Sequence, residues 1–203
     1  MVLCLATWML PLAGVALTSL HSAAELNRGQ MWLFPALPQW SNYATVLGES
    51  RLLRFVLNSV LVTIPTVAAT VLISAMAGFA LAKHRFAGNR VLLMVFVAGN
   101  LVPFQVLMIP VRDLVIALNL YDTRLALILF HTAFQTGFCT LFMRNFIREV
   151  PDPLLDAARV DGAGELRLFW LVVLPLVRPA LAAVSVLVFT FVWNDYFWSL
   201  VLV

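Results

Sequence analysis

The apolar positions of the chain gather into five runs of about 18 residues or more, the length that a helix needs to cross a bilayer. The runs are Val2 to Leu20, Phe55 to Ala82, Val91 to Val111, Leu125 to Met143 and Ala180 to Val203. Backbone amides in hydrocarbon must be satisfied within their own segment, and the runs lack the alternation of apolar and polar residues that marks barrel strands. The pattern predicts an all-α integral membrane protein, a bundle of transmembrane helices.

Composition supports the bilayer as the solvent. Hydrophobic residues make up 63% of the 203 residues and charged residues only 11%, against about 25% charged residues in a soluble domain. The net charge of +3 is small and scattered, which argues against a nucleic-acid partner. Cys4 and Cys139 lie in apolar runs without a metal-ligand spacing, so we interpret both as packing residues and expect no metal site.

The connecting segments predict the orientation. Residues 83–90 carry three basic residues and no acid, a pattern typical of the cytoplasmic side. Placing them inside also places residues 144–178 inside, with eight basic residues inside against five outside.

The two ends of the sequence raise separate questions. The first run has no basic residue before it, so we favour a retained span over a signal peptide. The last run stops without a flanking charge. We expect residues 1–203 to be a single transmembrane domain that is truncated at both ends.

The segment 144–179 is too long and too patterned for a simple turn. Asp152 is a good helix N-cap and Pro153 suits the first helical position, while Gly162 offers a left-handed stop. Gly164 is expected to cap a second helix that Pro175 interrupts. The short first helix has small residues on its surface and charged edges, which favours docking into a protein groove over lying on lipid.

This segment resembles the cytoplasmic signature of bacterial ABC importer permeases, E-A-A-x-x-x-G-x(9)-I-x-L-P. The matching positions are Asp156, Ala157, Ala158, Gly162, Val172, Leu174 and Pro175. Asp156 stands where the family usually has Glu, and Val172 where it has Ile. The resemblance implies that this loop, with Arg159 and Asp161, couples the permease to an ATPase.

The resemblance covers most of the chain and narrows to carbohydrate permeases of the maltose-permease type. It rests further on Asn58 and Ser59, on Pro103, and on the triplet Trp193, Asn194, Asp195. Ser199 departs from a proline common in the family. The resemblance implies that five of six spans are present, in a multi-pass protein of the bacterial inner membrane. Its implied partners are an ATPase dimer, a second permease subunit and an extracytoplasmic solute-binding protein.

The sequence has no GxxxxGK[ST] phosphate-binding loop, so ATP is expected to be used by the partner subunits and no cofactor by this chain. No catalytic set of residues can be assembled, and we expect no enzymatic activity. Polar residues within the spans are candidates for the substrate path, with interhelical hydrogen bonding as the alternative. They are Asn100, Gln105, Gln135, Asn194 and Asp195, with Trp193 as an aromatic neighbour.

Three other functions remain open at this point. An ABC importer permease for another solute class fits the same loop. An ion-coupled secondary transporter needs ionisable residues within the spans, and Asp195 and His131 qualify. A membrane scaffold without transport activity needs neither this loop nor ionisable residues within the spans.

Overall fold

The computed structural model describes residues 2–48, 51–99 and 101–203, which contain helices and turns and no strand. The predicted all-α class is confirmed. The chain divides into two compact units, Met1–Leu57 and Asn58–Val203, and each is described by itself.

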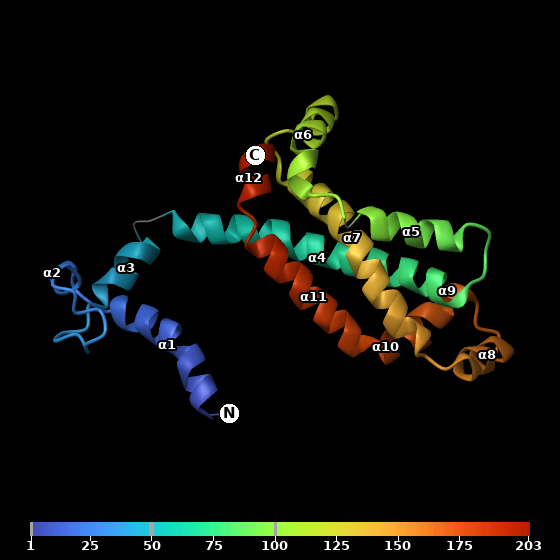
Figure 1. The fold of residues 1–203 in the computed structure, drawn as a ribbon, viewed down its shortest axis with the longest axis horizontal. Helices are drawn as coiled ribbons and strands as arrows, with labels where there is room; N and C mark the ends of the chain where they lie inside the picture. Colours follow the sequence, from blue (N-terminus) through green and yellow to red (C-terminus); the bar gives the residue numbers. More distant parts are fainter. Residues whose placement is uncertain (1, 49–50, 100) are drawn as a thin grey trace. The chain divides into compact units, whose positions relative to one another are not determined.

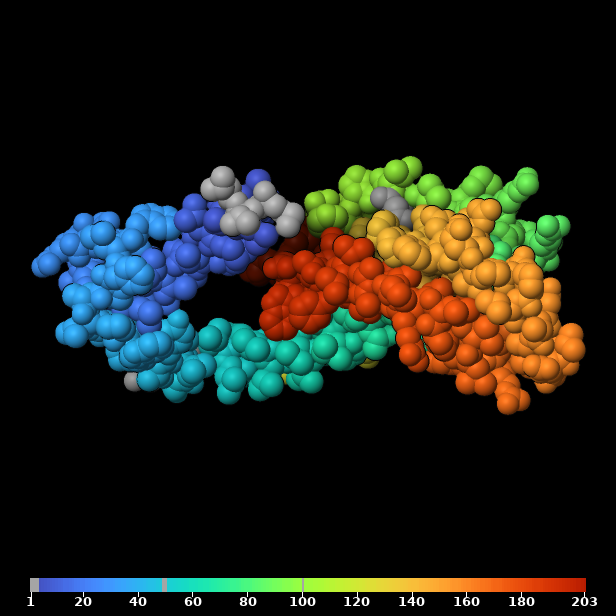
Figure 2. All heavy atoms as spheres, turned by 90° about the horizontal axis from the view of Figure 1, so that it is seen from below, coloured from blue at the N-terminus to red at the C-terminus, as the bar shows by residue number. Residues whose placement is uncertain are grey.

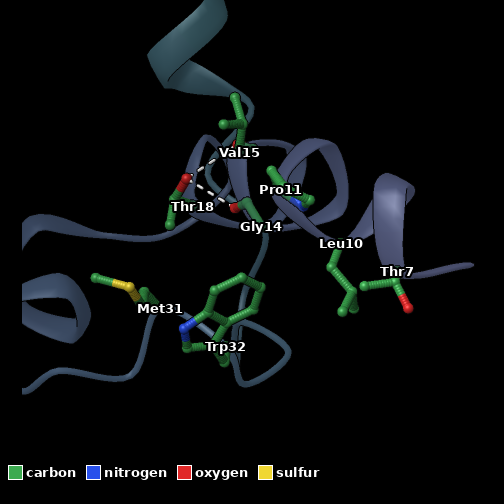
Figure 3. A pocket seen from close by; sticks show the side chains of 8 residues that line it. All are labelled: Thr7, Leu10, Pro11, Gly14, Val15, Thr18, Met31 and Trp32. Carbon is green, nitrogen blue, oxygen red and sulfur yellow. Dashed lines mark hydrogen bonds between the residues drawn. The ribbon is translucent and has the colours of Figure 1, made fainter. Parts of the chain in front are cut away.

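The described residues of the first unit form α1 (Val2–Thr18), α2 (Ala23–Asn27), α3 (Ser41–Gly48) and the start of a fourth helix. Ser22 begins α2 with a capping box, in which its hydroxyl and the Glu25 carboxylate satisfy each other's backbone amides. The ring of Trp32 lies against Gly14 of α1, where a Cβ would come within 2.8 Å of it (Figure 3). The walls of the open hollow beside this contact are mostly apolar. Thr18, one of the residues that line it, donates its hydroxyl hydrogen bond to the Gly14 and Val15 carbonyls of its own helix.

Two long helices form the frame of the second unit. They are α4 (Leu52–Lys83), whose first residues belong to the first unit, and α7 (Arg124–Arg148). Both are long and apolar enough to cross a membrane unbroken. The helices α5, α11 and α12 pack against α7, which therefore lies at the centre of this unit (Figure 1).

A stripe of hydroxyl residues and one glycine bring α4 close to α7. The buried stripe on α4 consists of Thr63, Thr66, Thr70 and Ser74. The Ser74 hydroxyl donates to the Thr136 carbonyl of α7 at 3.4 Å. One turn further on, a Cβ at Gly78 would lie 2.9 Å from the backbone nitrogen of Arg144, so only glycine permits this backbone approach.

The predicted span Val91 to Val111 is not one helix, and that prediction is wrong. Helix α5 (Asn89–Gly99) is followed by the short η1 (Phe104–Leu107) and α6 (Met108–Ala117), and the axes on the two sides of the break differ by 94°. Pro103 precedes η1 with non-helical backbone angles, φ -59° and ψ 121°, and a proline here also removes one hydrogen bond of a continuous helix.

The predicted interruption at Pro175 is also wrong, since it lies further along the chain. Helix α9 (Glu165–Leu168), the π-helical η2 (Phe169–Val173) and α10 (Leu174–Leu176) follow one another directly. The chain then bends by 80° before α11 (Arg178–Trp193). Pro175 directly follows the π-helical η2, and the chain stays helical through it although its nitrogen carries no hydrogen to donate.

The last predicted span, Ala180 to Val203, is divided as well. Helix α11 ends at Trp193, and α12 (Phe197–Leu202) follows a break. Asp195 causes the break, because its carboxylate accepts hydrogen bonds from the amides of Trp198 and Ser199 at the start of α12. Counting each bent pair as one span, the described residues contain up to four spans, and α1 is a shorter apolar helix.

Candidate functional site

The short helix predicted after Pro151 is present as α8 (Asp152–Val160). Gly162 ends it in the left-handed conformation with φ +82°. The amides of Gly162 and Ala163 donate to the carbonyls of Arg159 and Ala158, both at 3.0 Å, which satisfies the last turn. The prediction of a glycine-terminated helix is confirmed, and Gly164 caps α9 as expected. Asp152 is not the N-cap, because Pro151 occupies that position.

One side chain anchors α8 to the second unit while the opposite face stays open. Leu155 is 1% exposed and packs in the main core with Ile147 and Phe169. Asp156, Ala157 and Val160 are exposed, and α8 lies at the surface of one end of this unit (Figure 2). An anchored helix with a small, open outer face is suited to docking against another protein.

Arg159 holds the two ends of this loop together. Its guanidinium donates to Asp156 at 2.9 Å and to Glu165 of α9 at 3.1 Å. The Glu165 hydrogen bond, with that of Asp156, raises the pKa of Arg159 above its ordinary value. Glu165 also lies 3.3 Å from Nε2 of His84, just after α4. Within the described residues, Asp156, which stands where the family usually has the longer Glu, therefore pairs with Arg159 of the same helix.

Lys83, the last residue of α4, meets the start of α8. Its ammonium donates to the carbonyl of Val150 at 2.6 Å, to Oδ1 of Asp152 at 2.7 Å and to the carbonyl of Arg148 at 3.4 Å. The hydrogen bond from Lys83 lowers the pKa of the Asp152 carboxyl. The sequence reasoning assigned Lys83 only to the cytoplasmic charge bias and missed these contacts.

Several of these charged groups line a hollow of about 460 Å³ at one end of the unit. Its lining residues include Lys83 and Arg85 after α4, Arg148 at the end of α7, and Asp156 and Arg159 on α8. The two segments predicted to be cytoplasmic, 83–90 and 144–178, therefore meet at one end of the unit. At the other end of α4 and α7, Arg124 donates to Asn58 at 2.8 Å.

The remaining signature residues lie on either side of α9. Asp161 is exposed, and its backbone amide donates to Ala157 at 3.1 Å. Val172, Leu174 and Pro175 are half-buried in η2 and α10, and the first two pack against the main core. They lie just before the 80° bend into α11, on the helical segment of α9, η2 and α10 that connects the turn after α8 to α11.

The structure brings some of the predicted substrate-path residues together. Oδ2 of Asp195 lies 3.4 Å from Nε2 of His131 on α7, and Gln135 lies one helical turn further along α7. All three side chains are at least nine-tenths buried. Within the described residues, Nδ1 of His131 and Nε2 of Gln135 have no hydrogen-bond partner. His131 thus pairs with one of the predicted residues, Asp195, while Gln135 lies near it by helix spacing alone.

The other predicted residues that the structure describes have different surroundings. Asn194 is exposed, and its amide donates to the Thr190 carbonyl of its own helix at 2.7 Å. Trp193 is 38% exposed and stacks on Phe189. Gln105 is exposed on η1. Asn100 lies outside the described residues. For Asn194, the interhelical alternative is also not observed, because its bond is within one helix.

In the part of the chain that the structure describes, no group of three or more His, Cys, Asp or Glu residues could hold a metal ion. The candidate site consists of the loop around α8, with its open outer face, and a small buried polar group between α7 and the start of α12.

Comparisons with known proteins identify related transport components. Residues 70–203 match the family described as the binding-protein-dependent transport system inner membrane component. The chain is 34% identical over 194 residues to the arabinooligosaccharides transport system permease protein AraQ of Halalkalibacterium halodurans, covering 94% of this chain and 69% of that protein. It is 32% identical to the diacetylchitobiose uptake system permease protein NgcG of Streptomyces coelicolor, covering 93% and 62%.

A solved structure has the same fold. It is a chain of a bacterial ABC transporter involved in the import of the acidic polysaccharide alginate, with a TM-score of 0.86 and 27% identity. The match covers all of this chain and 70% of that one.

Proposed function

Since the chain belongs to the family of inner membrane components of binding-protein-dependent transport systems, we propose that it carries sugars through the bacterial inner membrane as the permease subunit of an ATP-driven importer. It is a transport permease and not an enzyme. The sugar assignment is supported by relatives whose names specify arabinooligosaccharides and diacetylchitobiose. A permease for another solute class is the alternative, and these relatives favour sugars over it.

The observation that carries the proposal is the open face of α8. Asp156 and Ala157 are exposed on a helix that Leu155 anchors to the core, and Gly162 is exposed just after its end. Residues 144–179 form the loop on which an ATPase dimer docks, and hydrolysis on that dimer moves α8 as a rigid body. Arg159 maintains the shape of the loop, whereas Val172, Leu174 and Pro175 transmit the movement to α11.

The partners follow from this arrangement. A second permease subunit pairs with this chain, whose residues 1–203 act as one transmembrane domain, and an extracytoplasmic binding protein delivers the sugar. ATP is bound by the ATPase subunits. The ion-coupled alternative requires exchangeable charges within the spans, whereas Asp195 is already engaged by His131 and by the amides that begin α12.

The substrate path includes Gln135, because a buried amide without a partner requires water or a ligand to satisfy it. Its Nε2 is a suitable donor to a sugar hydroxyl. Asp195 has a mainly structural role in this path, as the cap of α12. Asn100, Gln105, Asn194 and Trp193 remain candidate contacts along the path.

Uptake in a deletion strain tests the function. Cells lacking the chromosomal copy are supplied with radiolabelled diacetylchitobiose, an arabinooligosaccharide or an alpha-glucoside, with and without the gene on a plasmid. We expect gene-dependent uptake of at least one sugar that stops when ATP is depleted and continues in the presence of an uncoupler. Uptake that persists without ATP and stops with the uncoupler would overturn the proposal.

A further inference from the structure

The end of α4 meets the docking loop although the two are far apart in the sequence. Lys83 and Asp152 are separated by 69 residues. By contrast, α7 leads directly into α8, and α9, η2 and α10 connect α8 to α11 (Figure 1). A displacement of α8 therefore reaches α7 and α11 along the chain. It reaches α4 through the close packing of Gly78 against α7, through the bond from Arg144 of α7 to the Leu81 carbonyl at 3.4 Å, and through contacts that join α4 to α8 itself.

Lys83 makes the contacts that join α4 to the start of α8. An ammonium group has three donors, and the three oxygens around Lys83 are those of Val150, Arg148 and Asp152. Its side chain is only 6% exposed, so the charge is removed from bulk water and depends on these oxygens for compensation. Two of the acceptors are backbone carbonyls between α7 and α8, so the bonds follow the backbone itself.

A second, weaker contact runs parallel to the first. Arg159 of α8 binds Glu165, and Glu165 lies 3.3 Å from His84, the residue after Lys83. All three side chains are at least one third exposed, so water and salt screen this route. The buried contact at Lys83 is the one expected to carry force.

We propose that Lys83 is a positioning residue that locks the cytoplasmic end of α4 to the start of α8, so that ATPase-driven movement of α8 moves α4 together with α7 and α11. The inference rests on the proposed function, because it requires an ATPase that moves α8. Without the lock, α8 still docks and α11 still moves, but α4 stays behind and the spans no longer move as one body.

The test compares nucleotide-dependent movement on two helices in the complete importer. Nitroxide labels are attached at Met76→Cys on α4 or Leu187→Cys on α11, both on exposed positions, in a Cys4→Ser, Cys139→Ala background. Spectra are recorded in lipid nanodiscs without nucleotide and after trapping with ATP and vanadate. Each label is combined with Lys83→Met, with the conservative Lys83→Arg, and with Arg90→Gln as a control that removes an exposed positive charge from the same segment.

We expect Lys83→Met to reduce the spectral change at position 76 at least threefold while the change at position 187 stays within 30% of the unsubstituted importer. Lys83→Arg restores part of the change, since a guanidinium keeps the charge but cannot converge on three oxygens in the same way. Arg90→Gln leaves both changes intact. ATPase subunits co-purify with all variants.

Two results would overturn the inference. An unaltered change at position 76 in Lys83→Met means that α4 follows α8 by another route. An equal loss at both positions means that Lys83 only maintains the fold of the loop. If Lys83→Met fails to accumulate, Asp152→Asn replaces it, with a smaller loss expected at position 76 alone. Failure of the unsubstituted chain to co-purify with an ATPase refutes the proposed function itself and is read before any variant is compared.

Discussion

Substitutions at Gly162 can test whether the docking loop needs glycine for its backbone conformation or for the lack of a side chain. Its φ of +82° lies in the left-handed region, which costs a residue with a Cβ roughly 1 to 2 kcal/mol. A Cβ built at Gly162 meets nothing within 4 Å, so no clash within this chain adds to that cost. Gly162→Ala should therefore favour fraying of the last turn of α8 by about 5- to 30-fold.

Gly162→Asn is the informative partner of this substitution. Asn is larger than Ala but enters the left-handed region more readily. If the backbone decides, the Asn variant retains more of the α8 structure and more ATPase binding than the Ala variant. If the docking partner instead requires an empty surface at position 162, the Asn variant is the more damaged of the two.

Hydrogen exchange of the peptide that covers α8, measured by mass spectrometry on the purified permease, reads the first effect. Co-purification of the ATPase reads the second. We expect exchange to increase from glycine through Asn to Ala, with ATPase recovery falling in the same order. Exchange in Gly162→Ala equal to that of the unsubstituted chain would refute the backbone argument, because the strain would then have no energetic consequence.

Four further outcomes follow from other contacts. Lys83 lowers the pKa of Asp152, so this contact stabilises the fold at pH values above the unfolded pKa of Asp152 and is lost as the pH falls through the lower folded pKa. Lys83→Met should move the pKa of Asp152, followed by carbon-13 NMR, back up toward its usual range. An unchanged pKa would contradict the assignment of this contact. Gly78→Ala places a Cβ 2.9 Å from the backbone of α7 and should destabilise the protein by about 1 to 3 kcal/mol in thermal unfolding. The control Gly48→Ala has open space around it and should be nearly neutral. Equal melting temperatures of the two variants would show that α4 and α7 are not in close contact. Trp198 is 1% exposed, and its ring centroid lies 3.7 Å from that of Phe130. Trp198→Ala should therefore lower the free energy of unfolding by about 3 to 5 kcal/mol. A destabilisation no larger than that of Trp193→Ala, at a half-exposed position, would be inconsistent with this packing. Gln135→Leu should raise the KM for the transported sugar with little change in melting temperature, and a fall in stability at constant KM would assign Gln135 a structural role instead.

The parts of the site that the sequence predicted well depend on local signals. Pro153, Gly162 and Gly164 set the limits of α8 and α9 through backbone preferences that act within a few residues. The period of Thr63, Thr66, Thr70 and Ser74 is also readable in the sequence as one helix face. That stripe was missed because hydroxyl residues in an apolar run were not counted as a packing surface.

The sequence predictions were wrong where residues distant in the sequence, or a second role of the same residue, determine the local structure. Asp152 has the chemistry of an N-cap, but Lys83 binds its carboxylate from a helix that ends 69 positions earlier. Pro175 was expected to break a helix, yet the chain stays helical through it and the bend falls after Leu176. Asp195 lies in an apolar run, and its capping bonds to Trp198 and Ser199 end the span that hydropathy alone extends to Val203.

The contact partner of α8 in the membrane tests the account most directly. A photo-crosslinking amino acid is placed at the exposed Ala157, with Val186 on the exposed face of α11 as the control position, and irradiated in native membranes. The account predicts that position 157 yields a covalent adduct with an ATPase subunit, and that position 186 does not. Adducts at position 157 with phospholipid alone, under conditions in which the importer is active, would contradict it.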